Sequence, residues 1–132
     1  HPSHRFANMG GVDINDVAKE PLILYSAESS YFLLIEEVCN QAGITPNIEI
    51  RVDSVDSIKS MVELGLGISF VPRSSIQKEV KMGVLSLVQL GPSSRVLISN
   101  CVLVNRNEKS NPSVKVMLSV LEYLYSKWPT KP

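Results

Sequence analysis

The chain has 132 residues, of which 44% are hydrophobic and 20% are charged, and its 13 Lys and Arg residues balance 13 Asp and Glu residues. This composition predicts one folded domain, and the absence of net positive charge argues against a nucleic-acid-binding module, which needs a concentrated basic face. No apolar run approaches the ~20 residues that span a bilayer, and the first residues lack the apolar core of a secretory signal, so we expect a cytoplasmic protein without a membrane contact.

The first half of the chain alternates predicted helices and strands. A short helix is expected at 13–19, where Pro21 follows, and the continuous apolar run LILY at 22–25 is typical of a strand covered on both faces. A helix capped by Ser29 or Ser30 and ended by Gly43 follows, with an apolar stripe made of Phe32, Ile35, Val38, Cys39 and Ala42. The alternating segment IEIRV at 48–52 predicts a second strand with one wetter face.

The stretch SVDSIKSMVELGLGISFVP, residues 54–72, predicts a helix, a glycine turn and a third strand at 68–72. Asp53 or Ser54 is the expected N-cap, and Gly65 is the expected left-handed residue after the helix. Gly67 then allows a tight turn. Dinucleotide-binding folds place their glycines before a helix, so this Gly-x-Gly predicts no nucleotide cofactor.

The second half predicts a short helix at 73–80, strands at 84–90 and 95–106, and a final helix at 112–128. Asn111 is the expected cap of the final helix, whose expected buried side consists of Val114, Met117, Leu121, Leu124 and Trp128. The alternation of strands and helices predicts an α/β domain with a mainly parallel sheet.

Two cysteines, Cys39 and Cys101, fall in a predicted helix and a predicted strand, where both are expected to be buried apolar residues. A disulfide between them stays open at this level. Neither belongs to a Cys-x-x-Cys pair, so no metal site is expected. His1 and His4 have no nucleophile or carboxylate signature beside them, so neither catalysis nor a cofactor is expected.

Ligands of open α/β sheets gather beyond the carboxyl ends of the strands, at helix N-termini. The segments Ser26–Tyr31 and Asp53–Val55 have this position, and Gly67–Phe70 is a third, weaker candidate. The alternative is that their serines only cap helices. Three carboxylates at the helix starts disfavour an anionic ligand and favour a neutral or amine-bearing one: Glu28, Asp53 and Asp56. Arg51 and Lys59 are both expected to face solvent.

The order of these motifs resembles the effector-binding domain of LysR-type transcriptional regulators. HPSHRF resembles the family's His-Pro-Leu-Ala segment, and VDINDVAKEPLILY its short helix followed by Pro-Leu-Ile. The stretch AGITPNIEIRVDSVDSIKSMVELGLGISFVPRSSIQ resembles the family's central signature, and LVNRNEKSNPSVKVMLSVLEYL its last strand and closing helix.

This resemblance implies a Rossmann-like lobe of a type II periplasmic-binding-protein-like fold. Residues 1–90 would form most of the second lobe, and residues 91–132 the crossover strand and closing helix that return to a first lobe. The implied function is to bind a small-molecule effector between two lobes and thereby control DNA binding by the full-length oligomer. A solute-binding protein of a transport system, with the same fold, is the alternative.

The resemblance further implies that DNA is contacted only through an N-terminal winged helix-turn-helix, absent here, and that self-association occurs. Without a first lobe, the apolar side chains of the last strand and helix would be exposed: Ile98, Cys101, Leu103, Met117, Leu121, Leu124 and Trp128. The effector contacts implied by the family are Ser26, Ser29, Asp53 and Ser54. The full expected effector-binding set is Ser26, Ser29, Ser30, Asp53, Ser54, Val55, Gly67 and Phe70.

Overall fold

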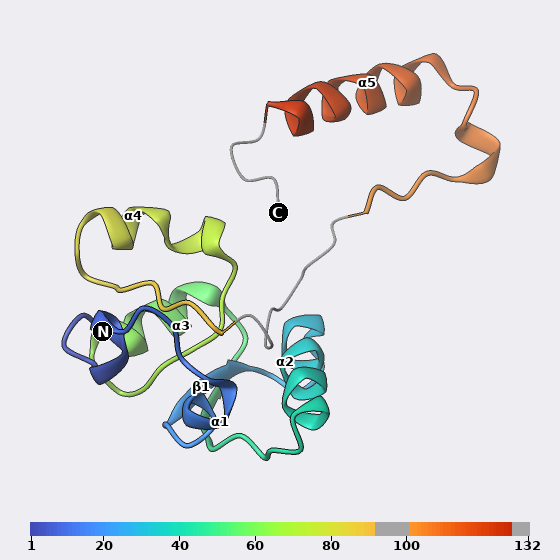
Figure 1. The fold of residues 1–132 in the computed structure, drawn as a ribbon. Helices are drawn as coiled ribbons and strands as arrows, with labels where there is room; N and C mark the ends of the chain where they lie inside the picture. Colours follow the sequence, from blue (N-terminus) through green and yellow to red (C-terminus); the bar gives the residue numbers. More distant parts are fainter. Residues whose placement is uncertain (92–100, 128–132) are drawn as a thin grey trace. The chain divides into compact units, whose positions relative to one another are not determined.

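Two parallel strands, β1 (Leu22–Tyr25) and β2 (Ile48–Val52), form the sheet on which the first half of the chain is built. The computed structural model describes residues 1–91 and 101–127 and divides into two compact units, His1–Leu97 and Ile98–Pro132 (Figure 1). The first unit contains these elements in order: η1 (Arg5–Asn8), α1 (Ile14–Val17), β1, α2 (Ser30–Gln41), β2, α3 (Val55–Glu63), η2 (Arg73–Ile76) and α4 (Gln77–Lys81). The second contains η4 (Arg106–Glu108) and α5 (Pro112–Ser126).

The core of the first unit lies around β1. All four residues of β1 are buried, whereas β2 alternates between half-buried and exposed residues, as the sequence predicts for both. A parallel bridge joins Leu22 to Ile68 on the side of β1 away from β2, with the Ile23 amide donating to the Ile68 carbonyl at 2.9 Å. The order across the sheet is therefore β2, β1, Ile68.

Two predicted strands are reduced to single bridges. Within residues 1–91 and 101–127, the segment 68–72 pairs only through Ile68, and the segment 84–90 pairs only through Leu90, which bridges Val12. Apolar alternation predicts which side chains are buried, but a strand also needs a partner of matching length. The partner Val12 is followed almost at once by α1, which leaves room for little more than one pair.

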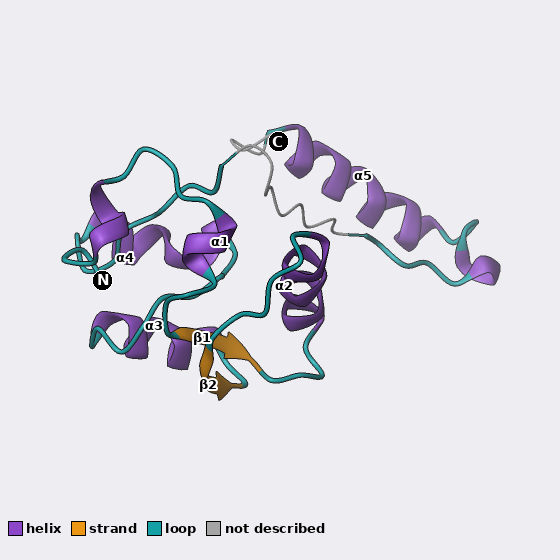
Figure 2. Cartoon of the chain, turned by 60° about the horizontal axis from the view of Figure 1, so that its bottom comes forward, coloured by secondary structure: helices purple, strands orange, loops and turns teal. Residues whose placement is uncertain are grey.

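Helices α2 and α3 both contact β1 and lie on opposite sides of the strand pair (Figure 2). The buried residues of α2 are Phe32, Ile35 and Cys39, on the predicted stripe, while Ala42 at its C-cap is exposed. The two helices lie on opposite sides because both connections are right-handed but run in opposite directions across the sheet. Helix α2 connects β1 to β2, and α3 connects β2 to Ile68, on the other side of β1. The domain is an α/β fold.

The helix ends follow the predicted chemistry. Ser29 caps α2, Ser54 caps α3, and Asn111 caps α5 with Pro112 in its first turn. Gly43 and Gly65 follow α2 and α3 with φ of 69° and 75°, the left-handed conformation expected after a helix. These boundaries are set by local chemistry, which the sequence contains in full.

The N-terminal segment is held by a polar cluster around Glu20. Arg5 Nε donates to Glu20 Oε1 at 2.6 Å, and His4 Nε2 lies 3.3 Å from Glu20 Oε2. Burial favours a raised pKa for Glu20, but the hydrogen bonds from Arg5 and His4 outweigh it, so the pKa of this carboxyl lies below its ordinary value of 4.5.

We expect Glu20 to make unfolding pH-dependent in acid. A carboxyl whose pKa is lowered by folding contributes stability that is complete above 4.5 and disappears as pH falls through the folded pKa. The free energy of unfolding is measured by urea titration at several pH values between 6 and roughly 3. It should decrease less steeply with falling pH in E20Q than in the unmodified chain. The exposed E49Q is the matched control, and equal slopes for all three proteins would contradict this role of Glu20.

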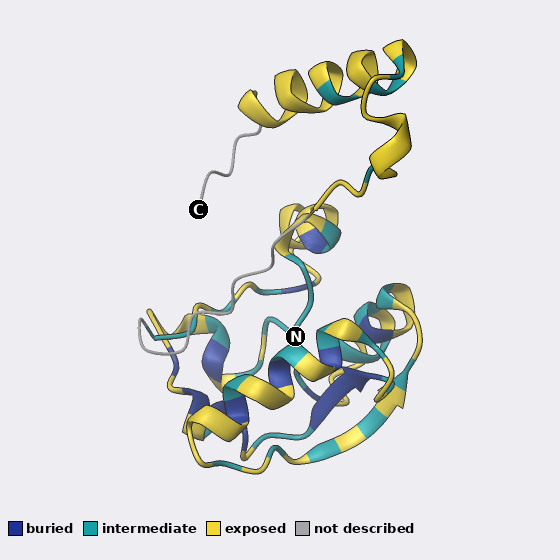
Figure 3. Ribbon diagram, turned by 90° about the vertical axis from the view of Figure 1, so that its right-hand side faces the viewer, coloured by how far each residue is buried: buried dark blue, intermediate teal, exposed yellow. Residues whose placement is uncertain are grey.

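The second unit buries none of the described residues of α5, whereas β1 is enclosed (Figure 3). The exposed apolar side chains include Leu103, Met117, Leu121 and Leu124. The prediction from helical periodicity that Met117, Leu121 and Leu124 are buried is therefore wrong for the single chain, whereas their exposure agrees with what the resemblance implies without a first lobe. Cys101 is also exposed, so the prediction that it is a buried core residue is wrong, while the prediction for Cys39 is confirmed. Ile98, Trp128 and the first half of the predicted strand, residues 95–100, lie outside the described residues. The second half of this prediction is wrong, because residues 101–105 form no strand and η4 begins at Arg106. No helix within residues 1–91 and 101–127 is long and apolar enough to cross a membrane.

Candidate functional site

Two of the predicted loops meet at the carboxyl ends of β1 and β2. Tyr25 and Val52 are partners in the parallel register, and the Ser26 amide donates to the Val52 carbonyl at 3.0 Å. The loop after β1 therefore lies directly beside Asp53, the first residue after β2. This contact brings together the Ser26–Tyr31 segment, which leads into α2, and the Asp53–Val55 segment, which leads into α3.

The serines of these loops have different partners. Ser29 Oγ accepts a hydrogen bond from the Tyr31 amide at 3.2 Å, and Ser54 Oγ accepts one from the Ser57 amide at 3.1 Å, so both hydroxyls cap helices. Ser26 is half-buried, and within the described part of the chain its hydroxyl has no hydrogen-bond partner. Ser30 and Asp53 are exposed, and Val55 packs against the core.

The third segment lies on the other side of β1. Gly67 is buried, and Phe70 is half-buried and packs against the core. Between them, Ser69 Oγ is buried without a hydrogen-bond partner among the described residues. A buried hydroxyl without a partner is costly, so this position needs an explanation. Ser69 lies within the candidate segment Gly67–Phe70 but is not among the residues expected to contact the effector, although a lone serine inside the apolar run ISFV is a usable signal.

An aromatic pair forms part of the same region. The rings of Tyr25 and Tyr31 are stacked with their centroids 5.2 Å apart and an angle of 25° between planes. Burial raises the pKa of the Tyr25 phenol, and Tyr31 raises it further, so Tyr25 is a neutral hydroxyl at physiological pH. The sequence gives no periodic signal for this pair, because the turn between β1 and α2 brings the two tyrosines together.

The charged side chains near these loops are largely paired. Lys59 Nζ lies 2.8 Å from Asp56 Oδ1 and 3.0 Å from Glu79 Oε1, which joins α3 to α4. The prediction that Lys59 faces solvent is wrong, because its partner Glu79 is supplied by a distant helix. Hydrogen bonds to Asp56 first and Glu79 second raise the pKa of the Lys59 ammonium. Arg51 is exposed, as predicted, and its guanidinium lies 4.3 Å from the centroid of the Phe32 ring.

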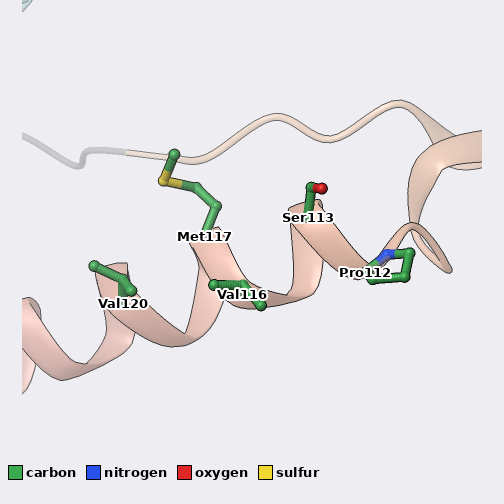
Figure 4. A pocket seen from close by; sticks show the side chains of 5 residues that line it. All are labelled: Pro112, Ser113, Val116, Met117 and Val120. Atoms are coloured by element: carbon green, nitrogen blue, oxygen red, sulfur yellow. The ribbon is translucent and has the colours of Figure 1, made fainter.

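Two hollows on the surface of the described residues lie away from these loops. One of about 480 Å³ is lined by α5 alone, through Pro112, Ser113, Val116, Met117 and Val120 (Figure 4). Another, of about 240 Å³, lies between α2 and the strands and includes Phe32 and Arg51. Neither includes the loops after β1 and β2. The hollow on α5 is lined by one helix and does not enclose a ligand, so the loops at the strand ends are the better candidate site.

Comparison with known families agrees with this architecture. The family model described as the LysR substrate binding domain matches residues 1–124. The chain belongs to this family. LysR substrate-binding domains are parts of transcriptional regulators, and the match extends over both compact units of the chain.

Individual relatives of this LysR domain are regulators too. It is 36% identical over 86 residues to a "Probable RuBisCO transcriptional regulator" of Cyanophora paradoxa, covering 63% of this chain and 26% of that protein. A protein with the same description from Porphyra purpurea is 32% identical over 91 residues, covering 67% of this chain and 29% of the relative. The chain thus spans less than a third of the length of these relatives.

Among solved structures, the effector-binding domain of QuiR in complex with shikimate has a TM-score of 0.61 at 21% identity, covering 69% of this chain and 42% of that one. At this level of identity the likeness concerns the fold, which is that of LysR effector-binding domains.

Proposed function

We propose that this chain is the ligand-sensing part of a cytoplasmic LysR-type regulator and binds a small-molecule effector at the carboxyl ends of its strands. The observation that carries the proposal is the convergence of three segments around β1, in which the Ser26 amide bonds to the Val52 carbonyl and Ile68 pairs on the other side. The chain leaves β1 toward α2 on one side of the sheet and leaves Ile68 toward η2 and α4 on the other. Open α/β sheets bind ligands at such a point, where neighbouring strands are followed by connections that go in opposite directions.

Residues 1–90 are proposed to be most of the second lobe of the sensor, with residues 91–132 returning to a first lobe. An effector that binds differently to two relative orientations of the lobes would shift their equilibrium. DNA binding would then change in the full-length oligomer through an N-terminal winged helix-turn-helix. The role is sensing and not catalysis, in keeping with a family of transcriptional regulators.

The serine hydroxyls test this site. Ser26→Ala and Ser69→Ala should each weaken effector binding by the full-length regulator about three- to tenfold, the loss of one neutral hydrogen bond. Shikimate is the first effector to test, given the QuiR complex. The measurement is isothermal titration calorimetry, with the exposed Ser60→Ala on α3 as the matched control.

Measuring the stability of each serine variant shows whether a loss of affinity comes from a lost contact with the effector or from a less stable protein. Ser69→Ala removes a buried hydroxyl without a partner, so the free protein should be at least as stable as before. Ser54→Ala, in contrast, should cost about 1 kcal/mol through loss of the α3 cap. Unchanged affinity in both Ser26→Ala and Ser69→Ala would reject this assignment of the site.

Self-association is proposed to involve α5, whose apolar side chains are exposed in the single chain. An apolar surface of this extent is unusual on a monomeric soluble protein. Light scattering of the purified chain should give about twice its mass of 14.6 kDa, and M117D should return it to the monomer mass. Leu33→Asp on α2 is a matched control, since Leu33 is 53% exposed and Met117 60% exposed. A monomer at all concentrations would contradict this proposal.

A further inference from the structure

We propose that the hollow between α2 and β2 is a second ligand site, which binds a small α-amino acid with an apolar side chain. The hollow has a volume of about 240 Å³ and lies on the face of the strand pair that α2 covers. It does not include the loops that follow β1 and β2, so this site is independent of the effector site proposed above.

The floor of the hollow is apolar and is shared with the protein core. Six apolar residues line it: Leu24, Phe32, Ile35, Ile44, Pro46 and Ile48. The first three are buried members of the core, and the other three are half-buried. Pockets for drug-sized ligands have volumes of about 300 Å³ or more, so a hollow below this range predicts a smaller ligand with an apolar group.

An irregularity in the strand pair turns Arg51 toward this hollow. The register shifts between Leu22 and Ile23, which adds one residue to β2. Ile48 and Arg51 are three residues apart and would point to opposite faces of a regular strand, yet both line the hollow. A bulge re-aims side chains in this way and is found next to functional sites.

The guanidinium of Arg51 offers a place for a carboxylate. It lies 4.3 Å from the centroid of the Phe32 ring, and it forms no ion pair within residues 1–91 and 101–127. Stacking uses the face of a guanidinium, whereas its N–H groups lie in its plane and match the two oxygens of a carboxylate. A side chain already stacked on a ring also loses less freedom when a ligand binds.

The hollow contains a carboxylate as well. Glu36 lies on α2, four residues after Phe32, and lines the same hollow as Arg51. In the described part of the chain these two charges are paired neither with each other nor with another residue. A simple acid would be repelled by Glu36 and a simple amine by Arg51. A molecule that carries both charges beside an apolar group satisfies the cation, the anion and the floor together.

Four matched probes test this ligand class: leucine, 4-methylpentanoate, isopentylamine and glycine. The second lacks the amine of leucine, the third its carboxylate and the fourth its apolar side chain. Each is titrated into the ¹⁵N-labelled chain at neutral pH, and the amide resonances are followed by NMR. Leucine should give saturable shifts at residues 36, 40, 44 and 51, with an affinity about threefold or more above that of each other probe, the contribution of one exposed ion pair.

Two variants assign the charges to their partners. Arg51→Met should weaken the binding of leucine and 4-methylpentanoate about threefold but not that of isopentylamine. Glu36→Gln should weaken leucine and isopentylamine by a similar factor but not 4-methylpentanoate. Both residues are exposed, so neither change disturbs the core. Glu49→Gln is the matched control, because Glu49 is exposed on β2, does not line the hollow and should leave all four affinities unchanged.

Several results would overturn the proposal. Binding of 4-methylpentanoate, isopentylamine or glycine as tight as that of leucine would reject the amino-acid class. The absence of saturable shifts with every probe would reject the site. Shifts confined to residues 26–31 and 53–55 would also reject it, while they would support the effector site at the strand ends. Shifts of the hollow's amides on dilution of the chain alone would show that a second copy covers this surface, and would overturn the proposal too.

Discussion

Replacing Gly67 with alanine is expected to destabilise the chain by about 3 kcal/mol, the upper range for overpacking of a core position. A Cβ at Gly67 would collide with the Pro21 carbonyl oxygen, and it would lie 3.2 Å from the Pro21 carbonyl carbon and 3.3 Å from Ile23 Cγ1. The colliding atoms belong to the backbone just before β1 and cannot rotate away as a flexible side chain could. Urea unfolding followed by circular dichroism measures the loss.

The matched control is Gly10→Ala, because a Cβ there meets no atom within 4 Å and Gly10 has no positive φ. This change should alter the free energy of unfolding by less than about 0.5 kcal/mol. Equal stability of Gly67→Ala and Gly10→Ala would show that the chain does not approach Pro21 so closely. Since Gly67 immediately precedes Ile68 and Ser69, Gly67→Ala should also weaken effector binding.

A second large effect is expected from Gly65→Val, at about 2 kcal/mol of lost stability. Gly65 follows the C-cap of α3 with φ of 75°, a conformation that strains a β-branched residue. The space around it is empty, so the strain is conformational and not steric crowding by neighbours. Gly65→Asn separates the two causes, because asparagine tolerates the left-handed region and should lose less. A loss as large for asparagine as for valine would contradict this explanation.

Local chemistry made much of this fold predictable from sequence. Ser29, Ser54 and Asn111 were identified as caps or cap candidates because a cap depends on residues within one turn. The conformations of Gly43 and Gly65 follow from the same short-range rules. The alternation in β2 and the continuous apolar run of β1 also predicted their burial, since both patterns depend only on which faces are covered.

The predictions that were wrong concern residues whose structure depends on partners far away in the sequence. The segments 68–72 and 84–90 have strand-like composition, but in the described part of the structure each forms a bridge at only one residue, Ile68 with Leu22 and Leu90 with Val12. Lys59 was assigned to solvent because Glu79, 20 residues away, was not known to approach it. The candidate site shows the same limit: its loops were predicted, whereas the buried Ser69 hydroxyl and the Tyr25–Tyr31 stack became visible only in three dimensions.

The ion pair between α3 and α4 has a mechanical consequence. Helix α3 begins at Val55, directly after its cap Ser54 in one of the proposed effector loops, and Lys59 lies about one turn further along. Lys59 bonds to Glu79 of α4, whose second carboxylate oxygen is buried and lacks a partner among the described residues. If α3 moves, either α4 moves with it or the Glu79 carboxylate loses its bond to Lys59. Movement of the two helices together would transmit a displacement at the start of α3 to α4, away from the loops.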